Sequence, residues 1–405
     1  MSCRDAAARG AWLGSCRQLF AVFWMMAWMC GWAAGGEPPR PEALIGYTEL
    51  QTDLPGGRHA NVVTMRAVVV RANGTGRRVI GENLTRQPSS WTSFAGWSPD
   101  GQTAIVGRGW ASPENAAWEE EHKQFRFAEG AWSYDMILID LAHDRQFNAT
   151  AVDRVSFYNS GVFFWPDNPR QLGFQALIDG KSHPFRMDRD GHDKRDLTKG
   201  SRAFTYGFSA SPDGRRVAYH KDFQVYVADA QGANARQVKT GQAFNFFPQW
   251  SPDGAYLAFL SGQHLRCHPY LVDADGSGLR KLADRKSYAG VVDFLDVPDF
   301  HGGSSDVPVW APDGQSLFYT GQVGRQVHLL RVTLDGKSEQ LTRAEPDARY
   351  YHPAVSPDGK WLACGGKRDG VRQIYIIRLD DRHAYALTSL AKGRGAMWPH
   401  WQTRQ

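Results

Sequence analysis

Strand-like runs of apolar residues with alternating polar positions recur along most of the chain, and a tight turn precedes each run. The Ser-Pro-Asp-Gly turn at 251–254 precedes the run 256–259, and its variant at 311–314 precedes the run 316–319. Pro presets φ at the second position of such a turn, Asp bonds its own backbone, and Gly tolerates positive φ. The pattern therefore predicts β-hairpins. Further copies lie at 98–101, 211–214 and 356–359, with a degenerate copy at 165–168.

A second type of turn follows each hairpin. After another β-rich run comes a Gly, Asp or Asn turn, and then a short polar strand such as 279–282. Four strands in a unit of about 40 to 70 residues are typical of β-propeller blades. These second turns lie at 73–74, 142–143, 190–191, 231–232, 275–276, 335–336 and 380–381.

The number of turns predicts the number of blades. There are seven second turns but six first turns, because the unit around 73–74 has no Pro-Asp-Gly turn before it. The segment 397–401 resembles the segments that lead into other hairpins, such as 247–250. We therefore predict an all-β, seven-bladed propeller whose first blade is completed when residues 397–402 join the strands of 44–81, with six blades as the alternative. Such closure removes free sheet edges.

The repeated unit resembles a known family. Trp250, the turn at 251–254, the run 257–259 and the sequence Val-Asp-Ala-Asp-Gly-Ser at 272–277 are similar to the WD40-like repeats of TolB-like propellers. The resemblance extends over roughly residues 40–402. It implies the propeller fold, but similar repeats occur in periplasmic envelope proteins, peptidases and lyases, so it does not select one function.

The longest apolar run lies near the N-terminus, at 19–34. Arg4, Arg9 and Arg17 precede it, and small residues follow. This arrangement predicts a signal peptide at 1–36 and a single propeller domain at 37–405, located in the periplasm or outside the cell. An uncleaved anchor is the alternative, although about 16 apolar residues are few for a membrane span. We expect no stable membrane insertion once the signal is removed.

Charge and cysteine content narrow the function classes. The 405 residues carry a formal net charge of +5, spread too evenly to indicate a nucleic-acid partner. Five cysteines are present, of which only Cys267 and Cys364 follow the predicted signal peptide. Both lie in strand-like runs, which favours buried free thiols over a single disulfide. Nucleophile-elbow, phosphate-loop and His-Glu-x-x-His motifs are absent from the sequence, so it gives no support to hydrolase, kinase or zincin functions.

Aromatic and polar residues are frequent in the segments that lead into the innermost strands. In a propeller these segments gather around one mouth of the central channel, where they predict a site for an oligosaccharide or a protein partner. The alternative is that many of the aromatic residues pack between blades. The candidate ligand-binding residues are Trp91, Tyr158, Asn159, Tyr206, Asn245, Phe246, Arg349, Tyr351, His352, Arg394 and His400.

Two insertions are expected on the same face, at 107–133 and 285–308. The first contains Ser-Pro-Glu at 112–114, which predicts the capped start of a helix. Loops of this length in a repeat commonly form lids or binding walls, and lineage-specific decoration is the alternative.

A metal-dependent enzyme is the second hypothesis. Imidazole and carboxylate groups suit a divalent transition metal, and His301, Asp306, His352 and His400 are the weak candidates. The chain resembles oligogalacturonate lyases in its predicted blade number and in the His-Pro at 352–353. The resemblance implies a histidine cluster with a nearby glutamine, but this sequence lacks a second histidine close to His352. Arg349 and Arg394 would then be candidate carboxylate binders.

The leading hypothesis is a non-catalytic propeller that binds at its channel mouth. It needs no cofactor, whereas a lyase would use a divalent metal. A cell-envelope scaffold is the third hypothesis, with contacts spread over the blade edges.

Overall fold

Strands make up most of the regular secondary structure of the described residues, and within each sheet they are mainly antiparallel. The computed structural model describes residues 41–122, 126, 131–151, 162–178, 181–199, 201, 203, 205–292, 297–298, 305–343 and 348–403. By internal contacts the chain divides into Met1–Pro39 and Arg40–Gln405, and every described residue belongs to the second unit. The predicted signal peptide at 1–36 lies outside the described residues.

Four separate sheets have four strands each. The first contains β4 (Ser90–Trp97), β5 (Thr103–Ala111), β6 (Trp132–Asp140) and β7 (Arg145–Asn148). The second contains β8 (Phe163–Trp165), β9 (Asn168–Ile178), β10 (Lys181–Asp188) and β11 (Arg195–Asp196). The third contains β12 (Thr205–Ala210), β13 (Arg216–Lys221), β14 (Gln224–Asp229) and β15 (Arg236–Gln237). The fourth contains β16 (Phe244–Trp250), β17 (Tyr256–Gln263), β18 (Arg266–Asp273) and β19 (Arg280–Lys281).

Twelve further strands form one larger sheet, which consists of three antiparallel groups. The first group contains β22 (Val309–Trp310), β23 (Ser316–Val323), β24 (Gln326–Thr333) and β25 (Ser338–Gln340). The second contains β26 (Arg349–Val355), β27 (Trp361–Arg368), β28 (Val371–Arg378) and β29 (Ala384–Ala386). The third contains β30 (Arg394–Trp401), β1 (Leu44–Gln51), β2 (Arg66–Arg71) and β3 (Arg78–Val79). Single parallel bridges, Val327 to Arg349 and Arg372 to Gly395, join the groups.

Few other elements are described. They are helix α1 (Gly57–Val62), helix α2 (Pro113–His122), the short 3-10 helix η1 (Glu82–Thr85) and the strand pair β20 (Val291–Val292) and β21 (Val297–Pro298). Helix α2 begins at the proline that the sequence places first, so the prediction of a helix in the first insertion is confirmed.

The Ser-Pro-Asp-Gly segments form the hairpin turns that the sequence predicts. In the copy that joins β16 to β17, the Ser251 hydroxyl donates to Asp253 Oδ1 at 2.5 Å and accepts the backbone N–H of Tyr256 at 2.9 Å. Gly254 has a φ of 70°, a value that favours glycine. The side chains of the turn thus satisfy backbone groups that lack a strand partner.

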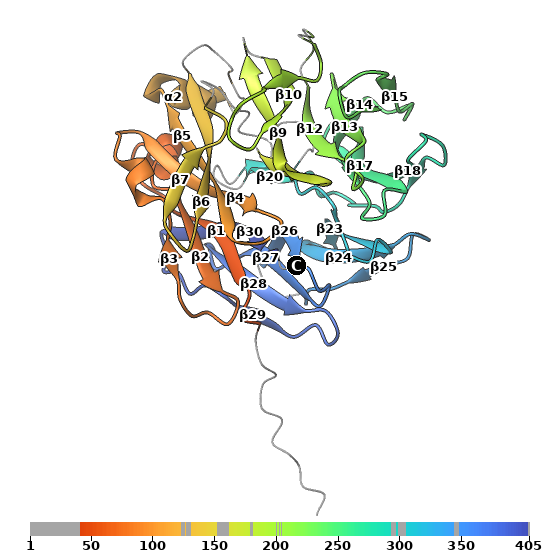
Figure 1. The fold of residues 1–405 in the computed structure, drawn as a ribbon. Coiled ribbons are helices and arrows are strands. Elements are labelled where there is room, and N and C mark those ends of the chain that lie inside the picture. The colour runs from red at the N-terminus through yellow and green to blue at the C-terminus, as the bar shows by residue number, and fades with distance from the viewer. Residues whose placement is uncertain are drawn as a thin grey trace, which may run out of the picture. The chain divides into compact units, whose positions relative to one another are not determined.

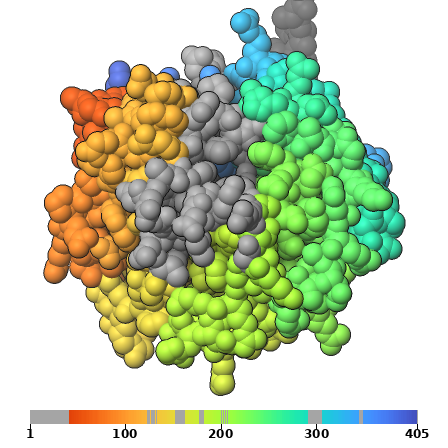
Figure 2. Space-filling model, turned by 90° about the horizontal axis from the view of Figure 1, so that it is seen from above, coloured from red at the N-terminus to blue at the C-terminus, as the bar shows by residue number. Residues whose placement is uncertain are grey.

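Apolar side chains fill the space between successive sheets. One cluster joins Val225 of β14 to Leu257 of β17, and the next joins Leu271 of β18 to Leu317 of β23. Figure 1 shows the labelled sheets following one another in chain order, and Figure 2 shows the same order on one face as colours that pass from orange through yellow and green to cyan. Longer strands such as β1, β17, β23 and β27 are buried at consecutive positions, so both of their faces are covered, whereas short outer strands such as β15 and β25 are largely exposed.

Tryptophans at the ends of β4, β22 and β30 connect neighbouring four-stranded groups. The indole N–H of Trp97 donates to the carbonyl of His400 at 3.1 Å, and that of Trp401 donates to the carbonyl of Ala354 at 2.9 Å. Trp310 makes the same kind of bond to Gln249 at 3.3 Å. These bonds give the repeated tryptophan a polar role in addition to its apolar packing.

The last strand lies beside the first. Strand β30 pairs antiparallel with β1, with Ile45 opposite Trp401 and Gln51 opposite Arg394. Cys267 and Cys364 are buried and free, which confirms the predicted absence of a disulfide between them.

Candidate functional site

Three residues from separate segments come together where β22, β26 and β30 lie near one another. Asp306 precedes β22, His352 lies in β26 and Trp398 lies in β30. The Asp306 Oδ1 atom accepts the backbone N–H of His352 at 2.8 Å and lies 3.2 Å from His352 Nε2. The rings of His352 and Trp398 have centroids 6.4 Å apart. We call these residues the Asp306–His352–Trp398 cluster.

The backbone of this cluster is held in an unusual conformation. The φ angles of Asp306, His352 and Trp398 are 55°, 50° and 54°, in the left-handed region that favours glycine. Phe247 in β16 has a φ of 51° and, like His352 and Trp398, precedes a proline. The pairing register shifts at Phe247 and at His352, so each lies at a bulge. Such bulges redirect a side chain, and conformations of this kind cost about 1–3 kcal/mol each, which makes them typical of binding sites.

Asp306 is the anchor of the cluster. Its side chain is buried, and its second oxygen, Oδ2, accepts a hydrogen bond from the hydroxyl of Tyr288. His352 keeps 20% of its side-chain surface exposed, and Trp398 is partly exposed. The cluster therefore presents an imidazole and an indole above a buried carboxylate.

His400 lies two residues beyond Trp398 in β30. Burial, together with the nearby positive charge of His352 when it is protonated, lowers the pKa of His400 from its ordinary value to about 4. Its ring lies 5.7 Å from the ring of Phe94. His400 is therefore neutral at physiological pH, and it contributes to the cluster as a partly buried neutral ring.

Four other candidate residues have buried side chains. Trp91, Asn245, Phe246 and Tyr351 are between 0% and 3% exposed. The amide of Asn245 donates to the Phe223 carbonyl at 2.9 Å, and its oxygen accepts the Ser261 hydroxyl at 2.7 Å. In this structure these side chains pack within and between sheets, as the alternative interpretation of the aromatic segments expects.

Of the remaining candidate residues, the structure describes some fully, one only in its backbone, and others not at all. Arg349 and Arg394 are exposed at the first residues of β26 and β30. Tyr206 lies in β12 with its backbone opposite His220, but its side chain is outside the described part. Tyr158, Asn159 and His301 lie outside the described residues.

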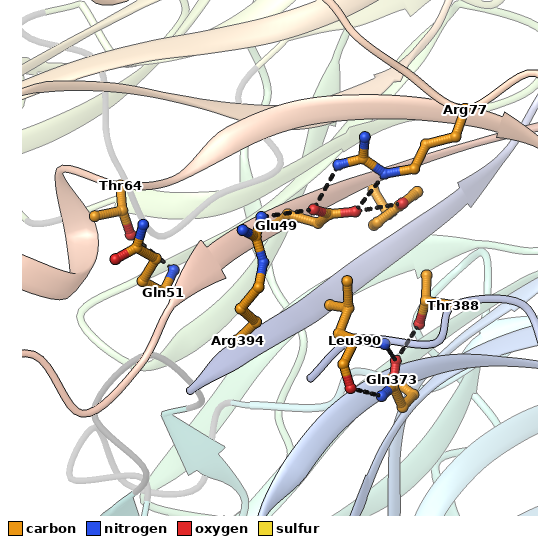
Figure 3. Close-up of polar contacts among 9 residues, drawn as sticks. Glu49, Gln51, Thr64, Arg77, Gln373, Thr388, Leu390 and Arg394 are labelled. Atoms are coloured by element: carbon orange, nitrogen blue, oxygen red, sulfur yellow. Dashed lines mark hydrogen bonds and ion pairs between the residues drawn. The ribbon is translucent and has the colours of Figure 1, made fainter. Parts of the chain in front are cut away.

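Arg394 is oriented by Glu49, which is not among the candidate residues predicted from the sequence. Figure 3 shows the carboxylate of Glu49 between the guanidinium groups of Arg77 and Arg394. Arg77 donates from Nε and Nη2 at 2.9 and 2.6 Å, Arg394 donates from Nη2 at 3.3 Å, and the hydroxyl of Tyr47 donates at 2.7 Å. Two partly exposed arginines thus surround one buried carboxylate, which leaves one excess positive charge.

The ionisation of Glu49 reflects this arrangement. Burial alone would raise its pKa, but the hydrogen bonds and charge of Arg77 and the Tyr47 hydroxyl outweigh burial and lower it. The available signal in the sequence is a lone acidic residue in the otherwise uncharged strand of residues 44–51. Its partners come from distant segments, so the strand by itself does not reveal them.

The described residues do not supply a set of metal ligands. Among them, no group of three or more His, Cys, Asp or Glu side chains is arranged to hold an ion. Both oxygens of Asp306 already accept hydrogen bonds, one from His352 and one from Tyr288. The cluster as described is therefore a hydrogen-bonded site.

Helices in the described part of the chain are short, and none has the length and apolar character needed to cross a membrane.

Comparisons with known proteins identify relatives over parts of the chain. No family model matches it. Over 200 residues it is 28% identical to the uncharacterized peptidase YuxL of Bacillus subtilis, a match that covers 38% of this chain and 28% of YuxL. Over 84 residues it is 33% identical to the Tol-Pal system protein TolB of Thioalkalivibrio sulfidiphilus, covering 19% of each chain. The chain thus spans less than two thirds of the length of these curated relatives.

Similarity to solved structures extends further along the chain. An oligogalacturonate lyase in complex with manganese superposes with a TM-score of 0.53 at 14% identity, over 88% of this chain and 89% of the lyase. At this identity the likeness concerns the fold. The hairpin repeats, the four-stranded sheets and the short matches to TolB agree with one another, and they show that the chain is similar to TolB-like β-propellers.

Proposed function

We propose that the chain is a secreted or periplasmic, seven-bladed propeller, completed by β30, that binds a ligand or protein partner at its channel mouth without catalysing a reaction. The observation that carries this proposal is the convergence of Asp306, His352 and Trp398 from three separate segments of the chain. The left-handed backbone at all three positions supports it, because conformations of this kind are common at ligand-binding sites.

The chemistry of the surrounding residues favours an acidic partner. Trp398 offers an aromatic surface for stacking, and exposed Arg394 and Arg349 offer forked donors to carboxylates. Because Glu49 already orients Arg394, this arginine loses little side-chain freedom on binding. An acidic oligosaccharide or an acidic protein segment fits this combination.

The binding experiment compares two tryptophan variants. Trp398→Ala removes the stacking surface, and Trp361→Ala removes a partly buried tryptophan of β27 as a matched control. Binding would be measured by calorimetry with acidic and neutral oligosaccharides, and by quantitative pull-down from an envelope fraction. We expect a partner that binds the wild type and Trp361→Ala but binds Trp398→Ala at least about tenfold more weakly, a loss typical of a central aromatic contact. If no oligosaccharide or protein distinguishes the two variants, the proposal is wrong.

A metal-dependent lyase is the second candidate, and the superposition on an oligogalacturonate lyase favours it. Metal content by mass spectrometry on the purified protein, combined with an assay for unsaturated products from oligogalacturonides, tests it. Stoichiometric metal together with product formation would replace the non-catalytic proposal. Oligogalacturonide binding without product formation would support the non-catalytic proposal.

A further inference from the structure

Arg285 lies between β19 and β20, and its side chain is completely buried, with an exposed fraction of 0%. Its Nε, Nη1 and Nη2 atoms have no hydrogen-bond partner in the structure of the described residues. A guanidinium group carries five N–H donors and remains charged at physiological pH. A full positive charge is therefore enclosed without an ionic or hydrogen-bonded partner in the described part of the chain.

The backbone of Arg285 is fixed between two sheets. Its N–H donates to Nδ1 of His268 in β18 at 3.1 Å, and its carbonyl accepts the N–H of Gln322 in β23 at 3.1 Å. The same carbonyl accepts the N–H of Tyr288 at 3.2 Å. Because these bonds hold both peptide groups, the side chain begins from a fixed point in the interior.

The side chain has one favourable contact. The guanidinium carbon of Arg285 lies 4.7 Å from the centroid of the Tyr288 ring, a distance suited to a cation–π interaction. Such a contact replaces only part of the hydration that a buried cation loses. The hydroxyl of Tyr288 points to Asp306, so the ring connects Arg285 to the Asp306–His352–Trp398 cluster.

The carboxylates next to this residue already have other partners. Asp284 pairs with the Lys281 ammonium at 2.7 Å and accepts the N–H of Lys286 at 2.6 Å. Asp306 accepts from His352 and Tyr288. Neither carboxylate forms a hydrogen bond with the guanidinium of Arg285, so neither neutralises its charge by direct contact.

We propose that Arg285 binds the carboxylate of a ligand. The planar fork of a guanidinium matches the two oxygens of a carboxylate, and the bidentate pair is among the strongest hydrogen-bonded contacts in proteins. One negative charge neutralises the single buried positive charge, whereas a doubly charged sulfate would leave an excess negative charge in the interior. The site goes beyond the proposed function, because Arg285 is neither one of the exposed arginines nor a member of the Asp306–His352–Trp398 cluster, which it reaches only through the ring of Tyr288.

Thermal unfolding of the wild type and of two methionine variants tests the proposal. Arg285→Met removes the buried charge and keeps much of the apolar stem. Arg280→Met removes a partly exposed arginine of β19 and is the matched control. The probes are acetate and galacturonate, compared with chloride, galactose and sulfate at equal ionic strength. We expect saturating galacturonate or acetate to raise the Tm of the wild type and of Arg280→Met by about 3 °C or more.

The response of Arg285→Met decides the result. In chloride we expect its Tm to equal or exceed that of the wild type, because an uncompensated charge has been removed, and we expect no response to either carboxylate. A Tm well below that of Arg280→Met, or failure to fold, would overturn the proposal, because Arg285 would then stabilise the fold without an anion. Equal stabilisation by sulfate, or no response of the wild type to any carboxylate, would overturn it as well.

A third variant separates charge from geometry. Arg285→Lys keeps the positive charge but loses the fork, so we expect the carboxylate-induced rise in Tm to fall to less than half. An undiminished rise would contradict bidentate recognition. The outcome is independent of the proposed function, because a carboxylate response that depends on Arg285 can be present whether or not Trp398→Ala loses partner binding.

Discussion

Arg58 and Arg285 are both buried, but their positive charges have different surroundings. Arg58 of α1 is 8% exposed and lies 3.1 Å from Glu119 of α2, which is 2% exposed. Glu119 also accepts from the Asn115 amide at 3.0 Å and from the backbone of Arg126 at 3.1 Å. Arg285 has a tyrosine ring and no described carboxylate partner. The carboxylate that balances Arg58 comes from the chain itself. We infer that the carboxylate that balances Arg285 comes from a ligand.

The largest expected effect comes from breaking the first pair. Glu119→Gln removes the buried carboxylate that faces the Arg58 cation, so we expect the free energy of unfolding to fall by about 3–5 kcal/mol in urea titrations. Glu121→Gln, in the same helix but with 78% of its side chain exposed, is the control and should change stability by less than about 0.5 kcal/mol. Equal effects of the two substitutions would mean that the buried pair contributes no more than a surface pair.

His400 differs from the two buried arginines because its side chain can lose its positive charge. Its pKa is about 4 in the folded chain, below its ordinary value of 6.5, because burial disfavours the cation. The unfolded chain therefore binds the proton more tightly, so this contribution to stability is full above about pH 6.5 and is lost as the pH falls towards 4. We expect this loss to amount to about 1–3 kcal/mol.

Denaturant titrations of the wild type and of His400→Gln between pH 7 and pH 4 measure this effect. The variant should lose less stability on acidification, whereas His143→Gln, at an exposed position, should follow the wild type. Parallel pH profiles for the wild type and His400→Gln would show that His400 is not the titrating group.

A third region has a buried carboxylate with exposed arginines. In Glu49→Gln, water can solvate the freed edges of Arg77 and Arg394, which are 44% and 47% exposed. We therefore expect a smaller loss than for Glu119→Gln, about 1–2 kcal/mol, together with weaker binding through the released Arg394. Asp335→Asn, which affects an exposed pair with Lys337, is the control. A loss as large as that of Glu119→Gln would show that burial of the arginine is not the deciding variable.

The smallest effect is expected when both members of the first pair are replaced. The double variant Arg58→Met with Glu119→Met removes both charges, so we expect its free energy of unfolding to lie within about 1 kcal/mol of the wild type. A double-mutant cycle with the single variants measures the coupling. A double variant as unstable as Glu119→Gln would indicate that the loss arises from packing and not from an unpaired charge.

Local chemistry explains which features the sequence predicts. The hairpin at 251–254 depends on hydrogen bonds within six residues, so its residues alone indicate it. The helix that begins at Pro113 is likewise indicated by its first residues. Both features need no knowledge of distant segments.

The candidate site is less accessible to sequence reasoning. Asp306 and His352 are both candidates, but their contact joins positions 46 residues apart, and only the fold brings them together. Trp91 and Phe246 show the second difficulty. Strands with both faces covered are apolar on both sides, so the pattern does not distinguish an aromatic residue at the mouth from one between sheets. Arg285 falls within the insertion predicted at 285–308, but its burial depends on contacts with two sheets.

The pairing of β30 with β1 has a consequence for biosynthesis. Glu49 and Arg394 are 345 residues apart along the chain, so β1 emerges during synthesis long before its neighbour exists. Until the last segment is made, β1 has an edge without its native partner, and such edges promote aggregation. Contacts at this sequence separation also form slowly. Nascent chains lacking residues 394–401 should therefore depend on chaperones, and synthesis of these residues should be the step after which the chains become resistant to protease.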